Sequence, residues 1–357
     1  MVILHIANIE TAQLGGVNIA VPNLAEAQLS FAKVGLVNLT GEALDKVPTF
    51  FVSDVYENRL PAPFDRPDLV VFHEVYRPSF LKLSRFFIKK RIPYVVIPHG
   101  CLTKTAQRQK ALKKAVANLL LFRPFLKKAC AIQYLSEREK SQSHISCPSF
   151  VMGNGVILPQ KKKENLPSSP IRLVYIGRLD WKIKGLDLLL TAISRNHTWF
   201  QENQVTLSLY GPDQNGEHSF LRQWIETNGI ADCVTLHREV QNIKKENALL
   251  VADYFIQTSR SEGMPMGLLE ALSYGLPIIV TEGTGFARLA IEKNCGFGCS
   301  TTSDAIFTAI KEAVIHISEY ATLSQNARKL ITEQLEAQSV MKQTVSYYET
   351  LYKSPKK

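Results

Sequence analysis

The sequence lacks the motifs by which many nucleotide-binding enzymes hold phosphate or metal. It contains no GxxxxGK[ST] loop, and neither Gly283-Thr284-Gly285 nor Gly296-Phe297-Gly298 continues as GxGxxG after a strand. No Asp-x-Asp pair is present to hold a divalent metal on a diphosphate. These absences argue against an ATP site of the P-loop type and against a nicotinamide site.

Paired cysteines and long apolar runs are also missing. The six cysteines form no C-x-x-C pair and show no metal-type spacing with the eight histidines, so we expect reduced thiols packed as small apolar residues. The longest leucine stretch, 119–122, stops at Arg123, far short of the ~20 apolar residues of a spanning helix. The start of the chain has no basic region typical of a signal peptide. We therefore expect a soluble or peripheral protein of the cytoplasm.

The positive charge is distributed unevenly along the chain. The net charge is +10, but residues 1–160 hold 20 Lys and Arg against 11 Asp and Glu, whereas residues 161–357 hold 22 against 21. Between Glu74 and Glu137 there are 14 basic residues and no acidic one. The excess of basic residues therefore belongs to one segment of the first half.

Short apolar runs alternate with helical patterns in both halves of the chain, which predicts parallel sheets covered on both faces. The expected strands are 2–6, 68–72, 94–97 and 131–134 in the first half, and 171–176, 205–210, 234–237, 254–257 and 277–280 in the second. A polar segment rich in Pro, Ser and Lys separates the two halves. The expected organisation is a Rossmann-like domain over 1–157, a linker over 158–170, a second such domain over 171–335, and a C-terminal helix over 336–357 that could pack back on the first domain.

Two glutamates eight residues apart give the strongest chemical signal. Glu262 follows the expected strand 254–257, and Glu270 lies in the helix that begins after the Gly263-Met264-Pro265-Met266 turn. A carboxylate can accept hydrogen bonds from two sugar hydroxyls, and the N–H groups at a helix start suit a phosphate. Taken singly, each glutamate could equally be a solvated surface residue.

A second motif follows the first strand of the second domain. Gly177-Arg178-Leu179 leaves the strand end, and Lys184-Gly185 stands six residues further on, at the expected helix entrance. In doubly wound sheets, ligands bind at the carboxyl ends of the strands. Arg178 and Lys184 are therefore candidates for anion binding.

These two motifs together resemble those of the retaining glycosyltransferases of family four, which have the GT-B fold. Three further segments match the same family: Gly15-Gly16-Val17, Pro98-His99-Gly100 and Asn154-Gly155-Val156. The resemblance covers nearly the whole chain and is closest to enzymes that build bacterial surface polysaccharides. It implies an α/β fold of two Rossmann-like domains facing a central cleft.

The resemblance also implies a role for each matching residue. Arg178 and Lys184 would hold the nucleotide diphosphate in place of a metal, so no cofactor is expected. Glu262 would bind sugar hydroxyls, Glu270 the ribose, and His99 would lie beside the donor sugar. The remaining donor contacts would come from the two loop glycines and the turn: Gly15, Gly16, Gly263, Met264, Pro265, Met266, Gly267 and Leu268.

The reaction implied is sugar transfer with retained configuration. Departure of the nucleoside diphosphate leaves an oxocarbenium-like sugar, and Arg178 and Lys184 would stabilise the anion as it forms. No residue must serve as a covalent nucleophile. Met264 and Met266 differ from the residues common in relatives, so the donor sugar does not follow; a UDP-sugar is favoured, and Arg238-Glu239-Val240 is a candidate base-reading loop.

The basic segment suggests an acceptor at a membrane. Its cations include Lys104, Arg108, Lys110, Lys113 and Lys114, interleaved with leucines, and Pro124 is expected to break the helix. A basic amphipathic stretch fits the anionic surface of the inner membrane, where lipid-linked glycans are built. A solvated helix face over ordinary core is the competing interpretation. A nucleic-acid surface is disfavoured because aromatic residues are not interleaved with the cations.

Three functions remain open from the sequence. The first is a peripheral glycosyltransferase acting on a lipid-linked glycan. The second is a sugar-nucleotide epimerase of the same fold, which would need no acceptor. The third is a non-catalytic basic module, which would bind polyanions but no sugar nucleotide.

Overall fold

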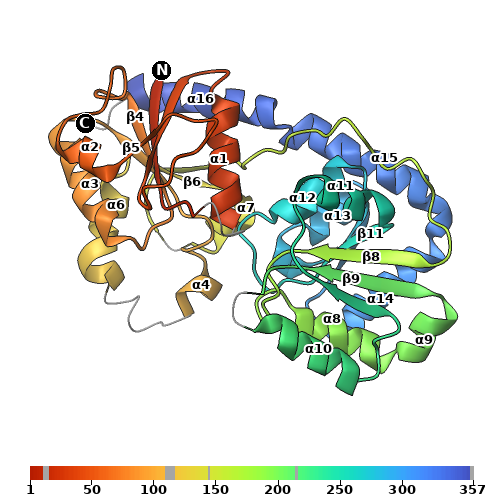
Figure 1. The fold of residues 1–357 in the computed structure, drawn as a ribbon. Helices are drawn as coiled ribbons and strands as arrows, with labels where there is room; N and C mark the ends of the chain where they lie inside the picture. The colour runs from red at the N-terminus through yellow and green to blue at the C-terminus, as the bar shows by residue number, and fades with distance from the viewer. Residues whose placement is uncertain (11–15, 109–116, 144, 214–215, 354–357) are drawn as a thin grey trace. The chain divides into compact units, whose positions relative to one another are not determined.

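The computed structural model describes residues 1–357 except 11–15, 109–116, 144, 214–215 and 354–357. It divides into two units, each described by itself below (Figure 1). Unit 1 comprises Met1–Gly155 and Ala337–Lys357, and unit 2 comprises Val156–Glu336. In the described chain no helix combines the length and apolar character needed to cross a membrane.

Unit 1 is built on a seven-stranded parallel sheet in the order β3-β2-β1-β4-β5-β6-β7. Its strands are β1 (Val2–Ala7), β2 (Lys33–Asn38), β3 (Thr49–Phe50), β4 (Leu69–His73), β5 (Tyr94–Ile97), β6 (Ala131–Tyr134) and β7 (Ser149–Val151). Its helical segments are α1 (Gly16–Gln28), α2 (Val52–Tyr56), α3 (Pro78–Lys89), α4 (Lys104–Arg108), the π-helical η1 (Asn118–Phe122), α6 (Arg123–Lys128), α7 (Glu137–Ser141) and α16 (Ala337–Lys353).

Two separate apolar layers cover the faces of this sheet. Leu4 and Phe72 point to one face, where they pack with α2, α3 and α6 around Phe80 and Phe125. On the other face, Leu36 of β2 packs with Val21 and neighbouring residues of α1. Side chains alternate along a strand, so His5, between Leu4 and Ile6, faces the α1 side. Val71, between Val70 and Phe72, faces the same side.

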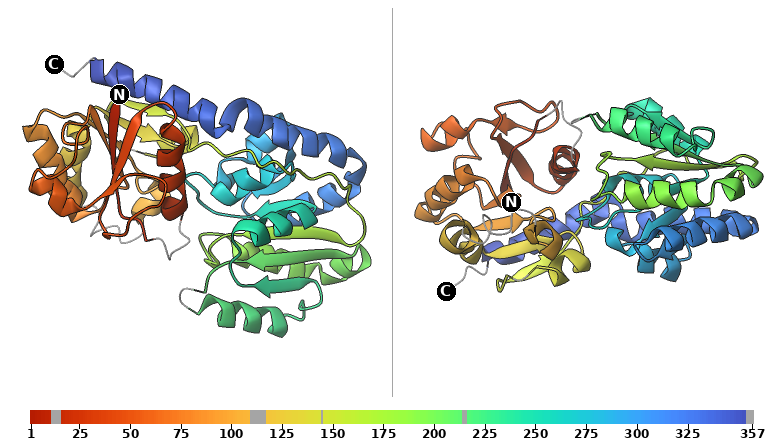
Figure 2. Two further views of the ribbon diagram at one scale, coloured as in Figure 1. Left: turned by 45° about the horizontal axis from the view of Figure 1, so that its top comes forward. Right: turned by 90° about the horizontal axis from the view of Figure 1, so that it is seen from below.

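The last helix, α16, belongs to unit 1 and lies beside α1 (Figure 2). Phe150 of β7 contacts the ring of Tyr347 at 4.2 Å, and the buried Tyr348 hydroxyl donates to Gln133 of β6. The apolar face of α16 therefore completes the core of a unit whose other residues come from the opposite end of the chain.

Unit 2 contains a six-stranded parallel sheet in the order β10-β9-β8-β11-β12-β13. Its strands are β8 (Ile171–Ile176), β9 (Val205–Tyr210), β10 (Val234–His237), β11 (Tyr254–Gln257), β12 (Ile278–Thr281) and β13 (Gly296–Cys299). Its helical segments are α8 (Leu186–Arg195), α9 (His197–Glu202), α10 (Glu217–Thr227), α11 (Asn242–Val251), α12 (Met266–Ser273), η2 (Glu282–Thr284), α13 (Ala287–Glu292), α14 (Ser303–Ile315), η3 (Ile317–Glu319), α15 (Tyr320–Leu330) and the π-helical η4 (Ile331–Leu335).

Helices cover both faces of the second sheet as well (Figure 1). One face packs on α8, α9, α10 and α14, with Leu189, Phe200 and Ile310 at the centre of the apolar cluster. The other face packs on α11, α12, α13 and α15, through Leu249 and Leu272 among others. The prediction of two doubly wound parallel-sheet units is thus confirmed.

Two local expectations differ from the structure. Pro124 does not end the helical segment; it stands in the first turn of α6, directly after the π-helical η1, and both Phe122 and Arg123 keep right-handed helical backbone angles. The polar segment 158–170 contacts unit 2 rather than lying free of it. Lys163 donates from Nζ to the carbonyl of Ala252 at 2.6 Å and pairs with Asp253 at 3.1 Å, with both side chains almost fully buried.

All six cysteines are free, and Cys233 and Cys295 are buried. Burial raises the pKa of the Cys295 thiol to about 11. That thiol therefore stays protonated at neutral pH and packs as a small apolar side chain.

Candidate functional site

The loops after β8 and β11 lie side by side at the carboxyl edge of the second sheet, because these two strands are paired. Lys184 belongs to the loop after β8, and Glu262 to the loop after β11. Their side chains meet, with Lys184 Nζ 2.6 Å from Glu262 Oε1, and both are nearly buried at 12% and 10% exposure. The structure thus brings together two of the residues that the sequence singled out.

Glu262 is held by further donors from its own loop. Gln257 Nε2 donates to Oε1 at 2.8 Å, and Ser259 Oγ donates to the same oxygen at 2.6 Å. Within the described part of the chain, all hydrogen bonds of this carboxylate go to Oε1. The second oxygen, Oε2, is therefore available to a ligand, while Oε1 fixes the carboxylate in place.

Gly185 allows the two loops to approach closely. It immediately precedes α8 with a φ of +67°, and a Cβ built there would lie 2.0 Å from the carbonyl oxygen of Thr258. The Thr258 hydroxyl donates to the carbonyl of Gly185 at 3.0 Å. Any side chain at this position would push the Lys184 loop away from the Glu262 loop.

An ion pair that the sequence analysis missed ties the same loops together. Arg260 donates to Asp187 through two nitrogens, at 2.6 and 2.9 Å, and also to the carbonyl of Lys182 at 2.6 Å. Burial would raise the pKa of Asp187, but the hydrogen bonds from Arg260 and Lys182 outweigh it and hold that pKa below its usual value. Because 73 residues separate Arg260 from Asp187, no local pattern could have paired them.

Arg178 and Glu270 do not join the Lys184–Glu262 pair. The Arg178 side chain is exposed, and it forms no ion pair with any residue that the structure describes. Its backbone carbonyl accepts a 2.6 Å hydrogen bond from the buried Tyr175 hydroxyl, which fixes the turn after β8. Glu270, one turn into α12, pairs instead with Lys245 of α11.

The turn between the two glutamates leads directly into α12. Pro265 precedes the helix, Met266 begins it, and Gly267 and Leu268 lie in its first turn. A Cβ built on Gly267 would lie 2.8 Å from the carbonyl oxygen of Ile176, so this helix start lies against the end of β8. The first turn of α12 thus shares the sheet edge with Lys184.

His99 occupies the corresponding edge of unit 1. It follows β5 with a φ of +50°, which is uncommon for a residue with a side chain. The next residue, Gly100, donates its N–H to the buried carboxylate of Glu139 at 2.5 Å. Burial raises the pKa of Glu139 and lowers that of His99 to about 4, so His99 is neutral at pH 7.

The other expected residues of unit 1 are only partly described. Gly16 begins α1, and nothing lies within 4 Å of a Cβ built there. Gly15, Lys110, Lys113 and Lys114 lie outside the described residues, and Arg108 is described through its backbone only, as the end of α4. Lys104 begins α4 and is exposed.

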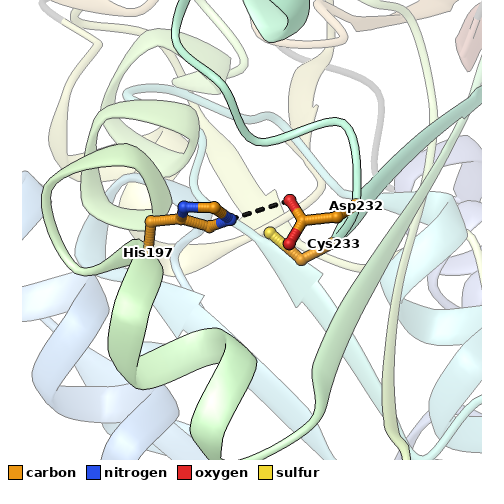
Figure 3. Close-up of side chains that lie close together, drawn as sticks. All are labelled: His197, Asp232 and Cys233. Atoms are coloured by element: carbon orange, nitrogen blue, oxygen red, sulfur yellow. Dashed lines mark hydrogen bonds and ion pairs between the residues drawn. The ribbon is translucent and has the colours of Figure 1, made fainter.

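One group of metal-type ligands occurs among the described residues, and it lies elsewhere: His197, Asp232 and Cys233 (Figure 3). Asp232 and Cys233 precede β10, so they lie at the amino edge of the sheet, opposite Lys184 and Glu262. His197 already pairs with Asp232 at 2.7 Å, and burial raises the pKa of Cys233 to about 12. This cluster is explained by its own hydrogen bonds.

Comparison with known proteins gives a family match within unit 2. Residues 157–330 match the family model of the glycosyl transferases group 1. A GDP-mannose:cellobiosyl-diphosphopolyprenol alpha-mannosyltransferase of Xanthomonas campestris is 28% identical over 187 residues, which are 51% of this chain and 46% of that protein. The GtfA subunit of a UDP-N-acetylglucosamine–peptide N-acetylglucosaminyltransferase of Streptococcus pneumoniae is 30% identical over 147 residues, 40% of this chain and 27% of that protein. The chain spans less than half the length of these curated relatives.

Solved structures match the whole chain at low sequence identity. Sucrose-phosphate synthase from Thermosynechococcus elongatus superposes with a TM-score of 0.78 at 17% identity, over 99% of this chain and 100% of that one. Anabaena Alr3699/HepE in complex with UDP gives a TM-score of 0.75 at 18% identity, over 98% of this chain and 100% of that one. At such identities the likeness shows the fold alone, and it confirms the expected GT-B fold.

Proposed function

We propose that this protein, whose residues 157–330 match the glycosyl transferases group 1, is a retaining, metal-independent hexosyltransferase. It moves a sugar from a nucleotide sugar to a lipid-linked glycan during synthesis of a cell-surface polysaccharide. The observation that carries this proposal is the Lys184–Glu262 pair, held at 2.6 Å where two neighbouring parallel strands end. At that edge the cation can bind the diphosphate of a sugar nucleotide, and the carboxylate can bind its sugar.

In the proposed reaction, unit 2 binds the donor. Lys184 and the exposed Arg178 contact the diphosphate, together with the start of α12 over Met266, Gly267 and Leu268. Glu262 accepts hydrogen bonds from sugar hydroxyls through Oε2, and Glu270 accepts from the ribose. To bind the ribose, the Glu270 carboxylate must either contact the ribose and Lys245 together or release Lys245.

Departure of the nucleoside diphosphate leaves an oxocarbenium-like sugar. The acceptor hydroxyl attacks it from the same face and gives its proton to the departing diphosphate. Lys184 and Arg178 stabilise the developing negative charge, so a bound metal is not required. From unit 1, His99 contacts the donor sugar, and the loop containing Gly15 and Gly16 contacts the phosphates. No covalent intermediate is part of this scheme.

We favour a UDP-sugar as the donor. The GtfA relative is named for UDP-N-acetylglucosamine, whereas the Xanthomonas relative is named for GDP-mannose, so these two nucleotides are the first to compare. The acceptor is proposed to be lipid-linked because the Xanthomonas relative is named for a diphosphopolyprenol acceptor. We propose accordingly that the protein acts at the cytoplasmic face of the membrane, without nucleic acid as a partner.

Exposed cations of unit 1 support peripheral attachment to an anionic membrane. Phe80 of α3 packs on Phe125 of α6 at 6.4 Å, so the two helices are neighbours. Their exposed cations, none of which forms an ion pair with a described residue, are Lys82, Arg85 and Lys89 of α3 and Arg123, Lys127 and Lys128 of α6. Each cation near such a surface contributes up to about 1 kcal/mol.

A donor screen tests the proposed function. The melting temperature is measured with UDP-, GDP-, ADP- and dTDP-sugars, and one of them should raise it because it binds only the folded protein. Product formation from that donor is then followed with a polyprenyl-diphosphate glycan, and the anomeric configuration of the product is determined. Binding of no sugar nucleotide would refute the proposal; conversion of the donor without acceptor would instead indicate the epimerase.

A further inference from the structure

Three histidines and one glutamine of unit 1 form a continuous hydrogen-bonded chain. His5 Nε2 lies 2.9 Å from Gln28 Oε1, and His5 Nδ1 lies 2.8 Å from His73 Nε2. His73 Nδ1 lies 2.9 Å from His99 Nε2. Gln28, His5 and His73 are fully buried, so the chain runs from the end of α1 through the interior to His99.

The register of the sheet produces this line of rings. His5 of β1 is opposite Val71 of β4, two residues before His73, so both side chains face the α1 side. His73 is in turn opposite Ile97 of β5, two residues before His99. Each step thus moves one strand across and two residues toward the carboxyl edge, while Gln28 closes the line from the end of α1.

The hydrogen-bond roles along the chain are coupled. A neutral imidazole has one nitrogen that donates and one that accepts. In the amide orientation of the structure, Gln28 Oε1 faces the His5 ring and can only accept, while Gln28 Nε2 has no partner among the described residues. His5 then carries its proton on Nε2, which leaves Nδ1 to accept from His73 Nε2. His73 Nδ1 then accepts from His99 Nε2, and His99 is left with an unprotonated Nδ1.

We infer that Gln28 is a positioning residue, which acts through His5 and His73 to fix His99 in the tautomer that presents Nδ1 as a hydrogen-bond acceptor. The use of this acceptor rests on the proposed function: Nδ1 would receive a hydrogen bond from a hydroxyl of the donor sugar. Nδ1 of His99 bonds to no residue that the structure describes.

The environment keeps all three rings neutral, as the argument requires. Burial lowers the pKa of His5 to about 4 and that of His99 to about 4, and it places the pKa of His73 well below the usual value. A protonated ring would donate from both nitrogens, so the rings beyond it would reverse their direction of donation and His99 Nδ1 would carry a proton instead of accepting one. At pH 7 the hydrogen-bonded chain of histidines therefore donates in one direction, which Gln28 sets at the buried end.

Nitrogen NMR tests the tautomer directly in the free protein. With the histidines labelled with ¹⁵N, and His99 assigned through a His99→Asn variant, long-range correlations distinguish a bare ring nitrogen from a protonated one. The wild-type protein should show His99 protonated on Nε2 and bare on Nδ1. His99 protonated on Nδ1 would overturn the inference.

Two variants of matched size test the role of Gln28. Gln28→Met removes the acceptor, and His5 Nε2 should then lose its proton, because an orphaned buried N–H costs more than an unpaired lone pair. The direction of donation reverses and the Nδ1–H form of His99 increases. Gln133→Met makes the same change at another buried glutamine of unit 1, which contacts Tyr348 and not the histidines, and it should leave His99 unchanged. An unchanged His99 in Gln28→Met would refute the relay.

Ligand titration separates this inference from the proposed function. Gln28→Met should weaken binding of UDP-glucose by about 2- to 10-fold, the loss of one hydrogen bond, and leave binding of UDP unchanged. If the donor screen selects guanosine, GDP-mannose and GDP replace this pair. Equal affinity of both proteins for the sugar nucleotide would exclude the contact from Nδ1. If the wild-type protein binds neither ligand, the proposed function fails, while the NMR result still decides the tautomer.

Discussion

At the residue scale, Lys184 differs from its neighbours by being buried against a carboxylate. Lys182, two positions earlier, is 73% exposed and pairs with Asp187, whereas Lys184 is 12% exposed and pairs with Glu262. A lysine is seldom buried unless it is paired. The burial of Lys184 beside Glu262, at the edge where β8 and β11 end, distinguishes it from Lys182. Lys182 is therefore a matched control on the same loop.

Lys184→Met should reduce sugar transfer by about 10- to 100-fold, because one charge-assisted hydrogen bond of about 1.5–3 kcal/mol is lost where the diphosphate forms. Steady-state transfer from the donor selected by the thermal screen measures the effect. Lys182→Met should change the rate by less than about three-fold. Equal losses in the two variants would mean that Lys184 has no special role.

The buried histidines should make unit 1 sensitive to acid. Their pKa values in the folded state lie near 4 for His5 and His99 and well below the usual value for His73, whereas the unfolded chain protonates near 6.5. Between these values the unfolded state binds more protons, so the free energy of unfolding falls as the pH falls. The slope should reach as much as about 1.4 kcal/mol per pH unit for each histidine.

Hydrogen exchange measured between pH 7 and pH 5, and corrected for intrinsic rates, reads the two units separately. Protection in β1, β4 and β5 should fall steeply, and protection in β11 and β12 should fall less. A His73→Phe variant should flatten the dependence in unit 1. A parallel loss of protection in both units would show that the histidine chain is not the cause.

At the element scale, the loop after β8 keeps its position through partners that are distant in sequence. Asp187 stands in the first turn of α8 and receives Arg260 from the loop after β11. This contact, with Gly185 against Thr258, sets the spacing of the two loops that carry Lys184 and Glu262.

Asp187→Asn should lower the free energy of unfolding of unit 2 by about 1–2 kcal/mol, a value that allows for partial exposure of Arg260. Urea unfolding followed by tryptophan fluorescence isolates this unit, since Trp181, Trp199 and Trp224 all lie in it. Because the pKa of Asp187 is depressed, its contribution is present above pH 4 and is lost as the pH falls further. The deficit of the variant should therefore shrink in acid.

Asp304→Asn is the control for this experiment. Asp304 also lies in the first turn of a helix, but its side chain is 87% exposed and it is 3.7 Å from Arg195. Its replacement should alter stability by no more than about 0.5 kcal/mol. A cost at Asp187 no larger than that at Asp304 would show that the tie between the loops contributes little.

The strands that the sequence predicted are those whose own residues form a short apolar run. The apolar runs at 94–97, 171–176 and 254–257 form strands with the same bounds, since they are central and covered on both faces. β2, β3, β7 and β13 went unpredicted. β3, β7 and β13 are short strands at the sheet edges, and Gly296–Cys299 of β13 carries two glycines, so these strands depend on their neighbours rather than on local preference. β2 is longer, but Lys33 and Gly35 interrupt its apolar run.

Like the strands, the site was predictable where its residues carry their own sequence signal. Lys184 and Glu262 meet because each follows a strand of the sheet, which their motifs indicated. The pairing of Glu270 with Lys245 was not predictable, because it depends on the packing of α11 against α12. The hydrogen-bonded line of His5, His73 and His99 was also not predictable, because it depends on the register of three strands.

At the scale of the whole molecule, the net charge of +10 is concentrated on unit 1. The helices α3 and α6 carry a row of exposed cations, accompanied by the exposed Leu121 of η1. Apolar side chains beside cations are typical of segments that lie at a membrane surface.

The protein should bind vesicles containing anionic phosphatidylglycerol at low salt, and high salt should release it. Replacing Lys82, Arg85 and Lys89 by Gln should weaken the binding by at least about ten-fold. Vesicle flotation measures the bound fraction. The same loss of charge at Lys293, Lys311 and Lys329, which are exposed on unit 2, should have a much smaller effect. Similar losses in both variants would indicate a response to net charge alone.

The discontinuous composition of unit 1 also has a consequence for biosynthesis. Its sheet is complete once residue 155 has been made, but α16, which contacts Phe150 through Tyr347 and Gln133 through Tyr348, is translated only after all of unit 2. The ribosome releases unit 2 in the interval between these two pieces. Unit 2 can therefore reach its native state on the nascent chain before unit 1 has gained the helix that completes its core.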